Sequence, residues 1–161
     1  MSAPLLVHMQ VIAATGLTVA VVVLMHYEGL LALGRRFARD RHLRRRDSTG
    51  PLGGPGRRLM LWTFFGLIAL HALEIVVFGS AFWALMQLAG TGSIAGAQEA
   101  SVFDAFYLSA MTYSTVGFGD LAPQGPIRWL AGAEALIGLM MVAWSASFAF
   151  MEMARHWRDD G

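Results

Sequence analysis

The sequence predicts an all-α membrane protein with three transmembrane helices and one shorter helix that enters the membrane without crossing it. Composition is the first reason, because 56% of the residues are hydrophobic and only 14% are charged. The second reason is that three nearly uncharged apolar stretches exceed the roughly 18 residues that a span needs. These stretches cover about residues 4–33, 59–88 and 127–153. The third is the apolar run 101–114, which is too short to span and must be enclosed by protein at membrane depth.

The first unit, residues 1–34, is an extra N-terminal span, which contains His26 and Glu28 but no regular arginine repeat of a voltage sensor. The next unit, residues 35–58, is a loop that holds nine of the twelve basic residues, all of them arginine. The positive-inside rule places this loop in the cytoplasm. Three spans then put the N-terminus outside and the short tail, residues 156–161, in the cytoplasm.

The arginine-rich loop has two possible roles. Its side chains either bind anionic lipid head groups, at about 1 kcal/mol for each arginine near the surface, or serve only to fix the topology. The sequence leaves both open, and it gives no reason to expect a nucleic acid partner.

The third unit, residues 59–155, is predicted to be a pore domain. It consists of an outer helix (59–88), a pore helix (101–114), a filter (115–120) and an inner helix (127–153). The filter reads Thr-Val-Gly-Phe-Gly-Asp. Its glycines carry no Cβ and adopt positive φ as readily as negative, so that successive carbonyl oxygens can point at one axis. Four copies around that axis would stack rings of oxygen that replace the hydration shell of K⁺. A plain glycine-rich turn is the alternative, which the flanking helices disfavour.

Residues 109–123, SAMTYSTVGFGDLAP, resemble the pore helix, filter and exit of the potassium-channel pore superfamily. Small bacterial ion-channel proteins with an extra leading helix are a closer likeness, through His26-Tyr27-Glu28 and the string WSASF at 144–148. The resemblance implies a homotetramer in a bacterial cytoplasmic (inner) membrane, with K⁺ as the transported ion and no cofactor. It implies K⁺ coordination by five residues of each chain: Thr115, Val116, Gly117, Phe118 and Gly119.

The string Glu134-Ala135-Leu136-Ile137-Gly138 resembles the inner helix of prokaryotic inward-rectifier-type channels, in which a glutamate precedes a hinge glycine by four residues. Gly138 is therefore a candidate gating hinge, and close packing against the pore helix is the alternative role. The same register implies that the inner cavity and gate are lined by Met141, Val142, Ser145, Phe148 and Met151.

Three positions depart from the family pattern. Phe118 replaces the commoner tyrosine, and Leu108 stands where an aromatic partner often lies. In the family pattern, this tyrosine and its aromatic partner form a hydrogen-bonded layer around the filter, called the cuff here. With Phe118 and Leu108 in their places, the cuff would consist of apolar packing instead. Met111 replaces a glutamate that many members carry behind the filter. Tyr107 remains able to reach Asp120 through its hydroxyl group.

Ionisable residues inside spans are costly and often functional. Glu74 and Glu134 fall at the depth of the filter, and we expect them to face the back of the pore helix. The predicted partners are Ser109, Thr112 and Tyr113, although ordinary interhelical hydrogen bonds would also explain the two carboxylates. His71 shares a helix face with Glu74, but two ligands do not complete a metal shell, and the chain has no cysteine. We therefore expect no metal other than K⁺.

The predicted function is passive K⁺-selective conduction through a tetrameric filter. A weakly selective cation channel is the nearest alternative, because the altered cuff would loosen the filter. A non-conducting membrane sensor or scaffold that retains the pore plan is a second alternative. An intramembrane enzyme is the most remote, since the sequence shows no catalytic constellation, so we expect no enzymatic activity.

Overall fold

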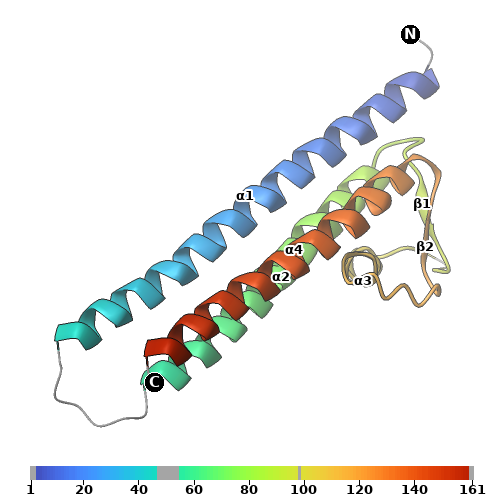
Figure 1. The fold of residues 1–161 in the computed structure, drawn as a ribbon. Helices are drawn as coiled ribbons and strands as arrows, with labels where there is room; N and C mark the ends of the chain where they lie inside the picture. The colour runs from blue at the N-terminus through green and yellow to red at the C-terminus, as the bar shows by residue number, and fades with distance from the viewer. Residues whose placement is uncertain (1–2, 47–54, 98, 160–161) are drawn as a thin grey trace.

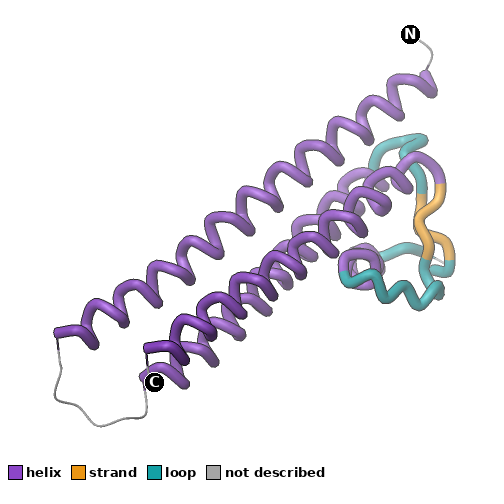
Figure 2. The backbone as a smooth tube through the Cα atoms, in the orientation of Figure 1, coloured by secondary structure: helices purple, strands orange, loops and turns teal. Residues whose placement is uncertain are grey.

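The computed structural model describes residues 3–46, 55–97 and 99–159. Its main elements are three long helices: α1 (Ala3–Arg46), α2 (Pro55–Met86) and α4 (Arg128–Asp159). The short helix α3 (Val102–Tyr113) lies at one end of the α2 and α4 pair, and α1 runs along both of those helices (Figure 1). Strands β1 (Ser93–Ala95) and β2 (Ala122–Gln124) and the 3₁₀ turn η1 (Gly125–Ile127) complete the same end (Figure 2).

Within the described part of the chain, three helices are long and apolar enough to cross a membrane, over Pro4–Arg39, Met60–Met86 and Gly125–Arg155. The predicted all-α membrane fold with three spans is therefore confirmed, and the two-stranded sheet is an addition that the sequence did not predict. The first helix continues to Arg46, well beyond the predicted end of its unit at residue 34. Residues 47–54 of the predicted arginine-rich loop, and the side chains of 40–59, lie outside the described part of the chain.

A capping box starts α3. The Ser101 hydroxyl accepts the backbone N–H of Asp104 at 3.2 Å, and the Ser101 N–H donates to the Asp104 carboxylate at 2.7 Å. These two bonds satisfy backbone donors that the first turn of a helix leaves free. The helix therefore begins one residue after the predicted boundary, and Ser114 caps its other end.

The core lies where α3 meets the long helices. Phe78 and Phe82 of α2, Leu130 of α4 and Val22 of α1 are fully buried there. Helices α2 and α3 approach closely at Gly79, because a Cβ at this position would lie 3.0 Å from the Cα of Phe106. A second, smaller cluster joins α1, α2 and α4 nearer the arginine-rich end of α1, and consists of Leu30, Leu33, Leu67 and Ala149.

The small sheet connects the segment after α2 to the segment after residue 120. β1 pairs antiparallel with β2, and Ser93 lies opposite Gln124. Gly96 follows β1 with a φ of 98°, and a Cβ at this position would overlap the carbonyl oxygen of Asp120. The sheet therefore fixes the path that the chain takes as it leaves Asp120.

Candidate functional site

The backbone of residues 115–120 has an unusual conformation. It follows α3 without regular secondary structure, and φ is positive at Thr115 (59°), Gly117 (53°) and Gly119 (81°). The N–H of Gly117 donates to the carbonyl oxygen of Met111 at 3.2 Å, which ties the segment back to α3. The two glycines thus adopt the positive φ values that their composition allows. Positive φ at Thr115 was not predicted and is uncommon for a residue with a Cβ.

This segment is exposed on the surface of the single chain. Val116 is 54% exposed and Phe118 is 71% exposed, and a Cβ at Gly117 or Gly119 would meet no atom within 4 Å. Leu108, in contrast, is buried within the chain. Apolar packing around Phe118, as expected for the cuff, would therefore need atoms from another chain.

Tyr107 of α3 is linked to the far end of the segment. Its hydrogen bond with Asp120 raises the pKa of Tyr107 above its ordinary value, and partial desolvation and the Asp120 charge act in the same direction. The carboxylate accepts a hydrogen bond from the phenol O–H and thereby stabilises the neutral phenol. The structure thus brings together the two residues that the sequence predicted to meet.

Glu134 of α4 faces the middle of α3. Its Oε1 lies 2.5 Å from the hydroxyl oxygen of Ser109, which lies 2.9 Å from the carbonyl oxygen of Ile75 in α2. Glu134 and Ser109 are fully buried, and the second carboxylate oxygen of Glu134 has no partner among the described residues. Ser109 is one of the three partners predicted for the two carboxylates, and its hydroxyl joins α2, α3 and α4.

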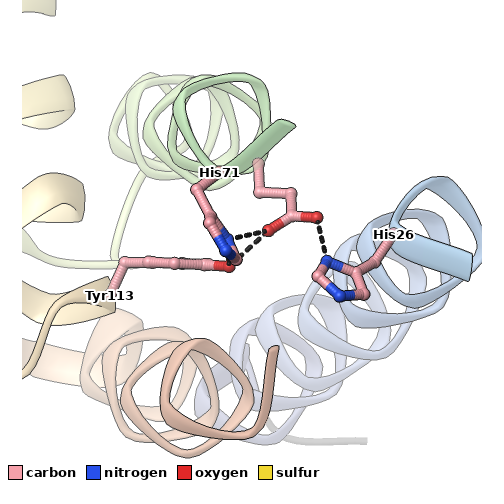
Figure 3. Close-up of polar contacts among 4 residues, drawn as sticks. His26, His71 and Tyr113 are labelled. Atoms are coloured by element: carbon pink, nitrogen blue, oxygen red, sulfur yellow. Dashed lines mark hydrogen bonds and ion pairs between the residues drawn. The ribbon is translucent and has the colours of Figure 1, made fainter. Parts of the chain in front are cut away.

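Glu74 of α2 contacts both Tyr113 at the end of α3 and His26 of the first helix; these two partners and His71 are labelled in Figure 3. The Tyr113 hydroxyl donates to Glu74 Oε2, and His71 Nδ1 lies 3.1 Å from the same oxygen. His26 Nδ1 lies 2.8 Å from Glu74 Oε1. Tyr113 was a predicted partner, whereas Thr112 instead accepts the Thr115 N–H through its carbonyl oxygen. The contact between His26 and Glu74 was not predicted. Its one sign in the sequence is that His26 is an ionisable residue within an apolar span.

The structure corrects the predicted lining of the inner cavity. Met141 and Ser145 are only 3% and 5% exposed in the single chain, so the chain itself covers them. Phe148 is partly buried against the cluster formed by α1, α2 and α4. Val142 and Met151 are 45% and 49% exposed, but they are separated by about two and a half helical turns and therefore lie on opposite sides of α4. Met141 and Ser145 are thus not free to line a cavity outside the single chain, and the roles of the other three residues stay predictions.

Comparison with known proteins agrees with this arrangement. A family model described as "Ion channel" matches residues 59–155. Protein LctB of Geobacillus stearothermophilus is 49% identical over 51 residues, which cover 32% of this chain and 38% of that protein. The inward rectifier potassium channel Kirbac3.1 of Paramagnetospirillum magnetotacticum is 38% identical over 77 residues, which cover 47% of this chain and 26% of that channel.

The chain thus spans well under half the length of these two relatives. The matches nevertheless confirm the predicted resemblance to the potassium-channel pore superfamily. Because the family model covers more than half of the chain, this protein belongs to the ion channel family.

Proposed function

We propose that four copies of this chain form a K⁺-selective channel. The observation that carries the proposal is the exposed segment 115–119, with positive φ at its first, third and fifth residues. One chain supplies one such segment, and four are needed to close rings of oxygen that replace the hydration shell of K⁺. The similarity to a relative whose name describes a potassium channel supports the same choice of ion.

In this proposal Thr115, Val116, Gly117, Phe118 and Gly119 coordinate K⁺. Tyr107 and Asp120 hold the outer end of the filter. Glu74, Thr112 and Glu134 support it from behind, either by fixing α3 or, in the case of Thr112, by accepting the Thr115 N–H. The C-terminal end of α3 directly precedes the filter, and its partial negative charge favours cations there.

The wider setting in the proposal is a bacterial cytoplasmic membrane. The arginine-rich segment 35–58 faces the cytoplasm with the C-terminus, and the N-terminus lies outside. The protein acts without a cofactor or enzymatic activity, and anionic lipid is a partner of the arginines. Val142 and Met151 are the two predicted lining residues that are exposed in the single chain, and because they lie on opposite sides of α4, at most one of them lines the inner cavity or gate.

Ion flux into liposomes tests the proposal. Purified protein is reconstituted, and K⁺ and Na⁺ fluxes are compared with and without Ba²⁺, with protein-free liposomes as the control. We expect K⁺ flux that Ba²⁺ blocks and little Na⁺ flux. Equal K⁺ and Na⁺ fluxes would favour the weakly selective channel, because Phe118 is 71% exposed in the single chain. Absence of flux from a protein that is not tetrameric would favour the scaffold.

A further inference from the structure

Four side chains meet in a buried cluster that the filter chemistry does not use (Figure 3). His26 comes from α1, His71 and Glu74 from α2, and Tyr113 from the end of α3; we refer to them as the histidine–glutamate cluster. His26 and Glu74 are fully buried, and the side chain of His71 is 20% exposed. The cluster lies behind the filter and joins the extra helix to the pore domain.

The distances within the cluster resemble those within a coordination shell. One ligand atom each from His26, His71 and Glu74 lie within 4.8 Å of one another. His71 Nδ1 lies 3.1 Å from Glu74 Oε2 and 2.9 Å from the Tyr113 oxygen, and His26 Nδ1 lies 2.8 Å from Glu74 Oε1. Bonds of about 2.0–2.2 Å to tetrahedral Zn²⁺ separate neighbouring ligand atoms by roughly 3.3–3.6 Å. The observed hydrogen-bond distances are shorter than these values, so the side chains would have to move apart to admit an ion, by about half an ångström for the His26 and Glu74 pair.

The donor set selects the kind of ion. Two imidazole nitrogens and one carboxylate match the ligands of three-residue zinc sites. K⁺, Mg²⁺ and Ca²⁺ prefer shells of oxygen, whereas imidazole favours first-row transition metals. The side chain of His71 is 20% exposed, so the described part of the single chain does not completely enclose the cluster. The sequence alone offered only His71 and Glu74, and the fold brings in the third ligand on α1.

We propose that His26, His71 and Glu74 bind one first-row transition-metal ion per chain, with Zn²⁺ as the probe and the Tyr113 hydroxyl at the fourth position. The ion would join α1, α2 and α3 at one point. Tyr113 is the last residue of α3 and lies two residues before Thr115. An effect of the metal on K⁺ conduction rests on the proposed function, but the binding itself does not.

The test is metal binding by the purified full-length protein in detergent after removal of metals with a chelator. Zn²⁺ binding is measured by isothermal titration calorimetry, and Co²⁺ binding by visible absorption. His26→Asn and His71→Asn place an amide near the Nδ1 position, so they retain a hydrogen bond to Glu74 but lack the imidazole ligand. His8→Asn is the matched control, because His8 is an exposed histidine of α1 whose Nδ1 contacts the Pro4 carbonyl oxygen.

We expect one Zn²⁺ per chain in the wild type and in His8→Asn, and at least a tenfold loss of affinity in each cluster variant. Absence of saturable Zn²⁺ binding in the wild type would overturn the proposal, and so would unchanged affinity in both cluster variants. If both variants fail to fold, the Co²⁺ spectrum of the wild type decides: four-coordinate bands support the site, and the spectrum of the hydrated ion refutes it. Flux measurements are separate, so an inactive channel that binds Zn²⁺ would count only against the proposed function.

Discussion

Gly138 of α4 lies directly against the backbone carbonyl group of Tyr113, the last residue of α3. A Cβ at position 138 would lie 2.9 Å from the carbonyl carbon of Tyr113 and would overlap its oxygen. The sequence left a hinge and close packing as alternative roles for this glycine. The structure accounts for it by packing, since the end of the pore helix can approach α4 only where no side chain intervenes. A hinge at Gly138 stays a prediction.

Gly138→Ala should destabilise the protein by about 1–3 kcal/mol, because the added methyl group overpacks a rigid backbone contact. The measurement is thermal or denaturant unfolding of the purified protein. Gly132→Ala is the matched control on the same helix, since a Cβ there would meet no atom within 4 Å. The control should be neutral or more stable by up to about 1 kcal/mol. Equal effects of the two substitutions would contradict the packing role.

Gly117→Ala should abolish K⁺ flux while the protein still assembles. Alanine is disfavoured by roughly 1–2 kcal/mol at the observed φ of 53°, and no atom of the chain lies close enough to block its methyl group. The defect should therefore appear in conduction rather than in folding. Liposome flux and the elution volume of the protein are measured together, and Gly16→Ala in α1 serves as the control that keeps its flux. Selective K⁺ flux in the Gly117 variant would refute the filter assignment.

Glu134→Ala should destabilise the protein more than Glu134→Gln does. Glutamine can still hydrogen-bond to Ser109, whereas alanine removes one of the two partners of this buried hydroxyl group and leaves a cavity. We expect the alanine variant to lose about 1–3 kcal/mol of stability and the glutamine variant to lose less. Open probability should change in both, and the K⁺/Na⁺ permeability ratio in neither. A changed ratio in Glu134→Gln would place this residue on the ion path.

Tyr107→Phe should remove a contribution to stability that depends on pH in a defined direction. Because the pKa of Tyr107 is raised by its bond to Asp120, the folded state favours the protonated phenol. Its contribution is therefore fully present below the ordinary tyrosine pKa of about 10 and is lost as pH rises through the higher folded value. The difference in melting temperature between wild type and variant should be constant from about pH 7 to about pH 9 and should shrink only above about pH 10. A difference that shrinks below that range would contradict the contact.

The sequence predicted those parts of the fold that depend on local properties of the chain. The length of an apolar stretch decides whether it spans a membrane, so all three spans were found. The pore helix was predicted over 101–114 and is observed over Val102–Tyr113, because serine caps stand at both of its ends. Positive φ at Gly117 and Gly119 is permitted by residue type, which is what the sequence could predict.

The remaining features depend on how the helices are rotated against one another. His26 meets Glu74 only because of the way α1 packs on α2. The burial of Met141 and Ser145 has the same origin, since a likeness to the inner helix of other channels does not say which face α1 and α2 will cover. The positive φ of Thr115 depends on its place between the end of α3 and Gly117, and its residue type gave no sign of it.

The continuity of α1 gives the first helix a mechanical property. It runs unbroken for 44 residues (Figure 1), or about 66 Å at 1.5 Å per residue, against a hydrocarbon layer of about 30 Å. His26 lies near the midpoint of this rod and contacts Glu74, which in turn contacts the last residue of α3. A rigid rod transmits tilt and rotation along its length, so a force applied to its arginine-rich end acts as on a lever. A displacement of the arginine-rich end would therefore reach the last residue of α3 through the contacts of His26 and Glu74.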